Sequence, residues 1–206
     1  MTTSADLLAL SPVIPVVVVD DAAHAVPLAR ALLRGGIGVI ELTLRTPAAL
    51  AAIERVAAEV PEIVIGAGTV TAPEHAEQAA KAGAAFLVTP GSTDRVLDAA
   101  EDTGLPFLPG AATVSEAMRL AERGLTALKF FPAEAAGGVD YLKSIGGPLP
   151  GLRFCPTGGI TVESAPRYLA LPNVGCVGGS WLTPKDALAA GDFDRVEALA
   201  RAAAAL

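Results

Sequence analysis

The chain contains few of the residue types that mark several common classes of protein. It has two cysteines, one tryptophan and two tyrosines in 206 residues. Cys155 and Cys176 lie in short apolar runs with no histidine or carboxylate at metal-ligand spacing. We therefore expect buried free thiols, with a disulfide or a metal site as the alternatives. The formal net charge of −7, without a basic cluster, argues against nucleic acid as a partner.

Long apolar runs are also missing, although hydrophobic residues make up 52% of the chain. No run approaches the roughly 18 residues of a membrane-spanning helix. The first residues, MTTSADLLALSPVIPVVVVDD, have no basic region and include Asp6, which argues against a signal peptide. We expect a soluble, cytoplasmic protein that makes no membrane contact. If it binds an anion, local donors must hold that anion, because the overall negative field repels it.

Short β-rich runs recur along the whole chain, separated by segments with helical spacing. Eight such runs occupy residues 13–19, 38–44, 62–69, 84–91, 105–111, 127–133, 153–159 and 174–180. Two of the helical segments carry clear end signals. The segment after residue 20 has Asp20 or Asp21 as its N-cap and ends at Gly35 and Gly36, and Thr113 with Glu116 predicts a capping box.

This alternation predicts right-handed βαβ units and a parallel sheet. Eight units in a chain of this length favour the α/β class and a (β/α)8 TIM barrel over an open doubly wound sheet. We expect the first dozen residues to add an N-terminal capping helix at the base of the barrel. No linker composition interrupts the chain, so residues 1–206 are predicted to form a single domain.

A lysine stands inside the apolar run ALKFFPAE, residues 127–134, although the chain has only four lysines. Side chains alternate along a strand, so Lys129 and Phe131 share the inner face while Leu128 and Phe130 face the helices. The same count places Glu41 on the inner face of the second predicted strand. The second and sixth strands of an eight-stranded barrel lie opposite each other, so Lys129 and Glu41 are expected to meet across the interior.

The chemical interpretation of this pair is a lysine nucleophile with a carboxyl partner. An ordinary lysine amine is almost entirely protonated at pH 7, burial favours its neutral form, and a nearby carboxylate opposes this. A neutral Lys129 amine forms a Schiff base with a carbonyl substrate, and Glu41 serves as general acid and base. The alternative is a buried ion pair with a purely structural role, and such pairs stabilise weakly.

Other strand ends carry groups suited to a small phosphorylated acid. Arg45 offers a planar fork for a carboxylate, and Thr69 ends the GAGT segment with a hydroxyl group. A solvated surface arginine and an ordinary strand-end cap are the simpler alternatives. Phe131 is suited to flank a flat imine or simply to fill the core.

Glycines follow the last two predicted strands, in PTGGI (156–160) and GGSWL (178–182). Backbone N–H groups left open there bind phosphate, and barrels often place a phosphate site after strands seven and eight. The candidate residues are Gly158, Gly159, Gly179 and Ser180, although glycine also serves to turn corners in such folds. His24 and His75 fall in helical segments and are expected to be ordinary residues of those helices.

Seven segments, in order along nearly the whole chain, resemble the class I 2-keto-3-deoxy-6-phosphogluconate (KDPG) aldolase and 4-hydroxy-2-oxoglutarate (KHG) aldolase family. They are ELTLRT, GAGTV, TPG, PGAATVSE, LKFFPAE, RFCPTGGI and GGSWL. The resemblance implies a (β/α)8 barrel that forms a homotrimer. It also implies cleavage of KDPG to pyruvate and glyceraldehyde 3-phosphate in the Entner–Doudoroff pathway, with no metal and no cofactor.

The resemblance also implies a role for each matching position. Lys129 matches the Schiff-base lysine and Glu41 the general acid/base. The positions that match substrate-binding residues are Arg45 and Thr69 for the pyruvate carboxylate, Pro90 and Phe131 for the lining of the site, and Gly158, Gly159 and Ser180 for the phosphate. Departures at Asp20 and Asp21 and at Ala111 and Ala112 concern substrate breadth more than the chemistry.

Three other functions remain open from the sequence. The nearest is KHG aldolase activity, which keeps the lysine chemistry with a substrate that carries no phosphate. A second is a phosphosugar isomerase or epimerase that uses Glu41 as its base and Lys129 only for electrostatic support. The third is a phosphometabolite-binding or oligomeric scaffold without turnover.

Overall fold

The computed structural model describes residues 3–206, in which strands alternate with helices. The strands are β1 (Val13–Val17), β2 (Val39–Thr43), β3 (Val64–Gly68), β4 (Phe86–Val88), β5 (Phe107–Leu108), β6 (Gly110–Ala111), β7 (Ala127–Phe130), β8 (Arg153–Pro156) and β9 (Val177–Gly179). The helices are α1 (Ser4–Leu7), η1 (Ala22–His24), α2 (Ala25–Arg34), α3 (Ala49–Glu59), α4 (Pro73–Lys81), α5 (Asp94–Asp102), α6 (Val114–Glu122), α7 (Gly138–Ile145), α8 (Ala165–Leu169), α9 (Lys185–Ala190) and α10 (Phe193–Ala204).

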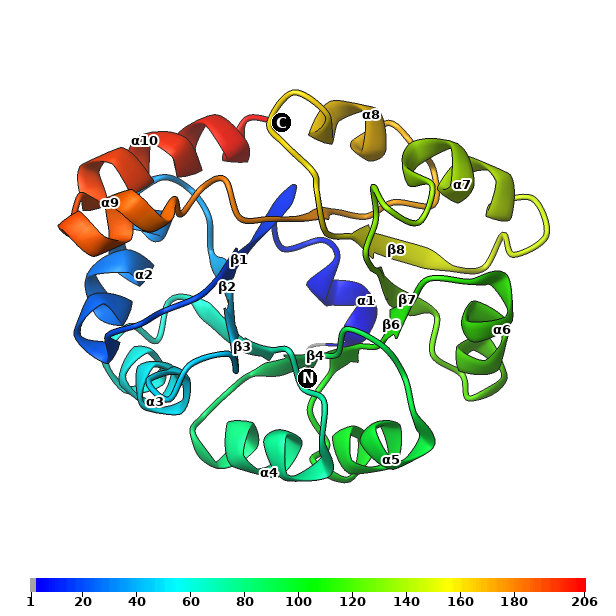
Figure 1. Cartoon of the computed structure of the whole chain (residues 1–206), viewed down its shortest axis with the longest axis horizontal. Coiled ribbons are helices and arrows are strands. Elements are labelled where there is room, and N and C mark those ends of the chain that lie inside the picture. Colours follow the sequence, from blue (N-terminus) through cyan, green and yellow to red (C-terminus); the bar gives the residue numbers. More distant parts are fainter. Residues whose placement is uncertain (1–2) are drawn as a thin grey trace.

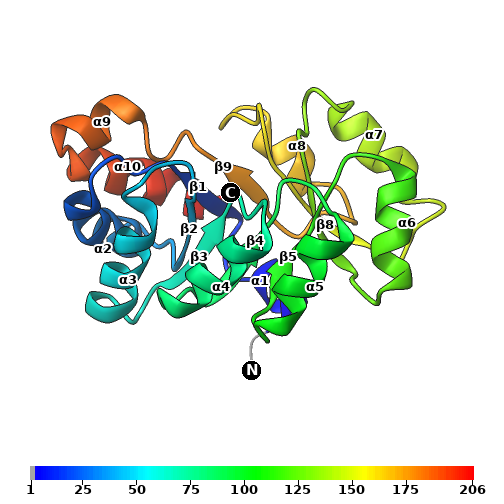
Figure 2. The ribbon, with the colours of Figure 1, turned by 60° about the horizontal axis from the view of Figure 1, so that its bottom comes forward.

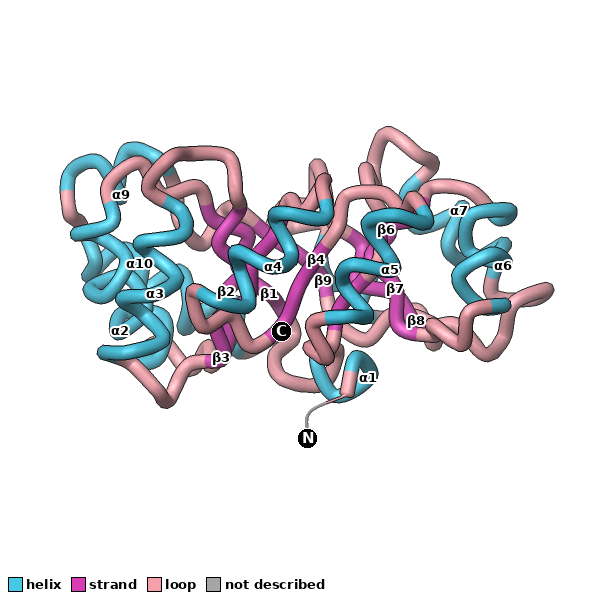
Figure 3. The backbone as a smooth tube through the Cα atoms, turned by 90° about the horizontal axis from the view of Figure 1, so that it is seen from below, coloured by secondary structure: helices cyan, strands magenta, loops and turns pink. Residues whose placement is uncertain are grey.

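The strands form a curled parallel sheet that the helices surround (Figure 1). Six strands pair in the order β5-β4-β3-β2-β1-β9 and three in the order β6-β7-β8. One residue separates β5 from β6 in the chain, and a parallel bridge between Thr157 and Gly178 connects the end of β8 to β9. The tube in Figure 3 shows the strands in the middle, with helices on the outside.

Each of the eight predicted runs contains a strand, and one run contains two. The run 105–111 divides into β5 and β6 at Pro109, which has no N–H group to donate to a neighbouring strand. β5 pairs with β4 and β6 pairs with β7, and the Pro109 carbonyl accepts a hydrogen bond from the Lys129 N–H at 2.9 Å. The expected single strand is therefore two short strands with different neighbours.

The helix end signals are confirmed with one correction at the first helix. The Asp21 side chain accepts a hydrogen bond from the Ala23 N–H at 2.8 Å, so it caps the short helix η1, whereas α2 begins after His24 without a side-chain cap and has Gly35 as its C-cap. In α6, Thr113 Oγ1 accepts from the Glu116 N–H at 3.2 Å while Glu116 Oε2 accepts from the Thr113 N–H at 2.9 Å. This reciprocal pair confirms the predicted capping box.

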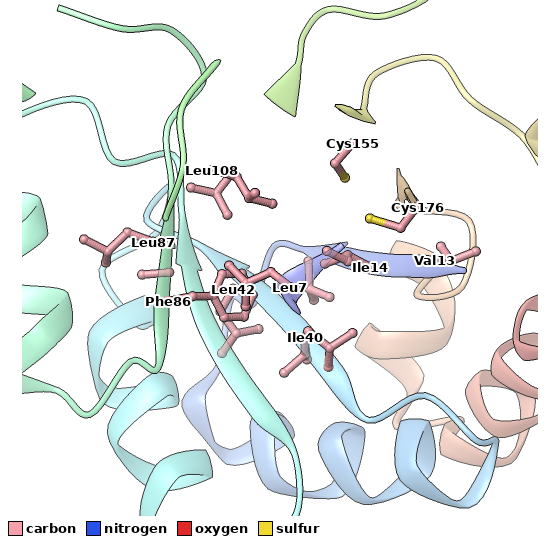
Figure 4. Close-up of a cluster of buried hydrophobic side chains, with 14 of the residues drawn as sticks. Leu7, Val13, Ile14, Ile40, Leu42, Phe86, Leu87, Leu108, Cys155 and Cys176 are labelled. Atoms are coloured by element: carbon pink, nitrogen blue, oxygen red, sulfur yellow. The ribbon is translucent and has the colours of Figure 1, made fainter. Parts of the chain in front are cut away.

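Apolar side chains from several strands form the buried core shown in Figure 4, together with Leu7 of α1. Ser4 of the same helix accepts a hydrogen bond from the Phe107 N–H of β5 at 3.2 Å. Figure 2 shows α1 at the opposite end of the molecule from the loop between β8 and α8. None of the helices described in residues 3–206 has both the length and the apolar character needed to cross a membrane.

Candidate functional site

Lys129 and Glu41 are in contact inside the curled sheet, as strand alternation predicts. Lys129 Nζ lies 3.2 Å from Glu41 Oε1, and the two residues are 5% and 3% exposed. They come from β7 and β2, which are 88 residues apart in the sequence. The other face of β7 is directed toward the surrounding helices. Phe130 on that face stacks on Tyr141 of α7, with ring centroids 5.4 Å apart and an angle of 5° between the ring planes. A buried amine therefore has one charged partner and an otherwise largely apolar setting.

Small residues on β3 make the room that Glu41 occupies. A Cβ atom at Gly68 would overlap the Glu41 carboxyl group, and one at Gly66 would overlap the Phe86 ring. Glycine at position 68 is thus required by the close approach of a neighbouring side chain. The GAG segment of β3 shapes the interior around the carboxyl group, in addition to ending a strand.

Arg45 and Thr69 lie together at the ends of β2 and β3. Arg45 Nε donates a hydrogen bond to Thr69 Oγ1 at 3.1 Å. Thr69 has φ = 60°, the one positive φ of a non-glycine residue in the described part of the chain. Such a conformation is unfavourable for a β-branched residue and is often found at binding sites. The two residues expected to hold a substrate carboxylate are therefore neighbours, with the guanidinium group exposed to solvent.

Phe131 lies between Lys129 and the glycines that follow β8. Lys129 Nζ is 5.6 Å from the centre of the Phe131 ring. A Cβ atom at Gly158 would lie 3.3 Å from the same ring, so the loop passes directly against Phe131. Gly158 and Gly159 have φ values of 106° and 80°, which glycine adopts readily and other residues rarely do.

The remaining predicted residues lie at neighbouring strand ends. Pro90 follows β4, and its backbone is so close to Gly110 that a Cβ there would overlap it. Gly110 in turn pairs with Lys129 in the β6–β7 register. Gly179 ends β9 and Ser180 follows it. This segment lies beside the end of β8, because Thr157 and Gly178 form a bridge. The two glycine segments proposed for phosphate binding are therefore adjacent.

Buried threonines are a feature that the sequence analysis did not single out. Thr43, Thr89 and Thr157 are all less than 10% exposed and stand at the ends of β2, β4 and β8. Thr43 Oγ1 donates to the Val17 carbonyl at 2.9 Å, and Thr89 Oγ1 accepts from the Gly110 N–H at 3.0 Å. These bonds tie the ends of neighbouring strands together. In the sequence, these buried positions could have been recognised by a threonine at the end of a strand-like run, in ELT, LVT and CPT.

The two cysteines lie in the interior next to the lysine. Cys155 pairs with Lys129 in the β7–β8 register, and the Cys155 and Cys176 sulfurs point toward each other in Figure 4. Both residues are buried, as expected. The neighbouring Cys155 thiol, together with burial and the nearby charge of Glu41, raises the pKa of the Cys176 thiol well above its usual value.

The histidines occupy ordinary helix positions, as the sequence indicates. His24 packs edge-on against Phe193 with ring centroids 6.0 Å apart, and His75 Nδ1 lies 3.3 Å from the Thr71 nitrogen. Within residues 3–206, no three histidine, cysteine, aspartate or glutamate side chains converge in a way that would hold a metal ion.

Comparison with known proteins places this chain in a family. The family model "KDPG and KHG aldolase" matches residues 5–199. The 2-dehydro-3-deoxy-phosphogluconate aldolase of Pseudoalteromonas atlantica is 52% identical, with 98% of this chain and 94% of that protein covered. The KHG/KDPG aldolase of Escherichia coli is 51% identical, with 98% of this chain and 95% of that protein covered.

Solved structures of similar proteins have the same fold. KDPG aldolase from Legionella pneumophila, with pyruvate captured as a covalent carbinolamine intermediate, has a TM-score of 0.96 and 45% identity over 98% of both chains. KDPG aldolase from Zymomonas mobilis with 3-phosphoglycerate has a TM-score of 0.93 and 45% identity, covering 100% of this chain and 96% of that one. The chain described here belongs to the KDPG and KHG aldolase family.

Proposed function

We propose that this protein is a class I aldolase that cleaves KDPG to pyruvate and glyceraldehyde 3-phosphate, a step of the Entner–Doudoroff pathway. The observation that carries the proposal is the buried contact of 3.2 Å between Lys129 Nζ and Glu41 Oε1. A buried ion pair stabilises a core only weakly, so its presence inside the curled sheet, below the strand ends where such folds carry their active sites, favours a chemical role. Two relatives that are 52% identical to this chain are named 2-dehydro-3-deoxy-phosphogluconate aldolase, which supports the proposal.

The proposed reaction begins with the neutral Lys129 amine attacking the C2 ketone to form a carbinolamine. The carbinolamine takes up a proton from solvent and loses water, which leaves a protonated imine. Glu41 then removes the proton of the C4 hydroxyl group. The C3–C4 bond breaks, its electrons move toward the imine nitrogen, and glyceraldehyde 3-phosphate leaves. Glu41 returns a proton to C3 of the enamine, which restores the protonated imine. Water then adds to C2 and releases pyruvate, the free amine and a proton to solvent. The imine itself is the electron sink, so the cycle uses neither a metal nor a cofactor.

Substrate binding in this proposal uses the strand ends around Lys129. Arg45 and Thr69 hold the pyruvate carboxylate, which the hydrogen bond of 3.1 Å between them supports. Pro90 and Phe131 line the space for the keto acid. The phosphate is bound by backbone N–H groups of the segments with Gly158, Gly159, Gly179 and Ser180, so that no basic patch is needed on an acidic protein.

KHG aldolase activity on the same site is the second candidate. The family model names both substrates, and Asp20 and Asp21 follow β1 at a position where basic residues would favour a phosphate. The ratio of kcat/KM for KDPG to kcat/KM for KHG measures the preference. A ratio below one would make KHG the principal substrate without changing the role of Lys129.

The proposal extends to fold closure and assembly. We infer one domain over residues 1–206 in which the two strand groups close into an eight-stranded barrel with α1 as its cap. The β5–β6 continuity, the Thr157–Gly178 bridge and the burial of Leu7 support this inference. By resemblance to the family, the enzyme is a cytoplasmic homotrimer.

The decisive experiment is treatment with pyruvate and sodium borohydride, followed by intact mass and peptide mapping. A reduced pyruvyl adduct on the peptide that contains Lys129 is expected, together with loss of aldol cleavage. Lys129→Ala should give neither adduct nor turnover, whereas Lys143→Ala, at an exposed lysine of α7, should keep both. Absence of an adduct in the folded wild-type protein would favour an isomerase or a binding function.

A further inference from the structure

The loops after β7 and β8 run side by side, and each carries part of the proposed site. We call residues 131–137, which follow the strand that carries Lys129, the lysine loop. Residues 157–164, which contain Gly158 and Gly159, are the glycine loop. The Ala133 N–H donates to the Thr157 carbonyl at 2.8 Å, and the Glu134 N–H donates to the Gly158 carbonyl at 3.1 Å. These two bonds extend the pairing of β7 with β8 beyond the strand ends. The position of the glycine loop relative to Lys129 therefore depends on what holds the lysine loop.

One side-chain hydrogen bond crosses from the helix after the glycine loop back to the lysine loop. Tyr168 Oη donates to Glu134 Oε1 at 2.7 Å. The Tyr168 residue is 0% exposed, so its ring is fixed within the core at α8. Burial, and then the bond to Glu134, raise the pKa of the Tyr168 hydroxyl, which keeps it a donor.

Two glycines make room for this pair. A Cβ atom at Gly159 would lie 2.8 Å from the Glu134 Cβ, so the glycine loop packs directly on the Glu134 side chain. A Cβ atom at Gly138 would lie 3.1 Å from the Tyr168 hydroxyl oxygen. The Glu134 side chain is thus held between the glycine loop on one side and the tyrosine on the other.

We propose that Tyr168 and Glu134 are positioning residues that fix the glycine loop for the phosphate end of the substrate. The inference rests on the proposed KDPG cleavage and adds to it a determinant of substrate class. Within residues 3–206 no hydrogen bond or ion pair joins either side chain to Lys129 or Glu41, so we expect the lysine chemistry to proceed without them. Loosening the bond lets the glycine loop shift, which weakens phosphate binding and leaves imine formation intact.

The test compares KDPG with 2-keto-3-deoxygluconate, which lacks only the phosphate group. In Tyr168→Phe the ring stays and the hydroxyl is lost. KM for KDPG is expected to rise about 5- to 10-fold, the effect of losing one ordinary hydrogen bond. The kcat for KDPG, kcat/KM for the dephosphorylated substrate and the yield of the pyruvate adduct are expected to stay within about twofold.

Three further variants separate positioning from general damage to the fold. Glu134→Gln keeps an acceptor oxygen for Tyr168 and should keep a KM near that of the wild type, whereas Glu134→Ala should behave like Tyr168→Phe. Tyr141→Phe is the matched control, because Tyr141 stacks on Phe130 at the outer face of β7. It should change neither substrate's kinetics.

Either of two results would overturn the proposal. One is an unchanged KM for KDPG in both Tyr168→Phe and Glu134→Ala, and the other is an equal loss of kcat/KM with the two substrates. Failure of the proposed function is a separate result, read from the wild-type protein. Without a pyruvate adduct on Lys129 and without KDPG cleavage in that protein, the aldolase proposal falls before any variant is measured.

Discussion

Lys129 on β7 donates to Glu41 on β2 at 3.2 Å, in an interior where both residues are at most 5% exposed. The contact fixes the carboxyl group within reach of any atom bonded to the lysine nitrogen. It also balances the charge of each partner, because a lone buried charge would be far less favourable.

The first prediction concerns the separate roles of the two groups. Glu41→Gln keeps the size of the side chain and removes its capacity to carry protons. We expect kcat for KDPG cleavage to fall at least 100-fold, since general acid–base catalysis contributes about 10²- to 10⁴-fold. The pyruvate adduct trapped by borohydride should still form on Lys129. If the variant forms no adduct, Glu41 is needed for imine formation itself.

The second prediction concerns the free energy of unfolding. Lys129→Met leaves the Glu41 carboxylate buried without its partner and should lower stability by about 3 kcal/mol in urea unfolding. The double variant Glu41→Gln/Lys129→Met should recover most of that loss. Lys81→Met is the control, because Lys81 is exposed and 3.9 Å from Glu77, and such pairs contribute less than about 1 kcal/mol. Equal losses in Lys129→Met and Lys81→Met would contradict the prediction.

The third prediction uses the glycine beside the carboxyl group. Gly68→Ala places a methyl group where the Glu41 carboxyl lies, so the carboxyl must move. We expect a loss of activity of about 100-fold with a destabilisation of roughly 1–3 kcal/mol, the usual range for an overpacked core. Gly38→Ala, where a Cβ meets no atom within 4 Å, is the matched control for activity. Full activity in Gly68→Ala would show that the position of Glu41 is not critical.

Strand positions and inward faces follow from local patterns, and so they could be predicted. Alternation of side chains along a strand placed Lys129 and Glu41 inside, and Phe130 outside against Tyr141, as observed. The capping box at Thr113 and Glu116 is likewise a pattern of four neighbouring residues. Such features are determined by residues that are close together in the sequence, so the sequence is enough to predict them.

Features that depend on distant segments were not predicted. The bond between Tyr168 and Glu134 joins residues 34 apart, and nothing near either residue in the sequence indicates its partner. Thr69 has a positive φ, which β-branched residues rarely adopt, and its hydroxyl bonds to Arg45, 24 residues away. Pro109 has no N–H group and so can interrupt a strand, but the pairing of β5 with β4 and of β6 with β7 is a property of the assembled sheet.

The last prediction concerns pH and the N-terminus of α6. Hydrogen bonds, first from the Ala112 N–H and also from Thr113, lower the pKa of Glu116 below its ordinary 4.5. A lowered pKa in the folded state means that this carboxylate stabilises the protein above the unfolded pKa, and that the effect is lost as pH falls through the folded value. Glu116→Ala should therefore cost about 1 kcal/mol at pH 7 and distinctly less at pH 2.5, measured by urea unfolding. Glu122→Ala, at the other end of the helix, should show no such pH-dependent deficit. A deficit for Glu116→Ala that stays constant from pH 7 to pH 2.5 would mean that its carboxylate does not act as the cap.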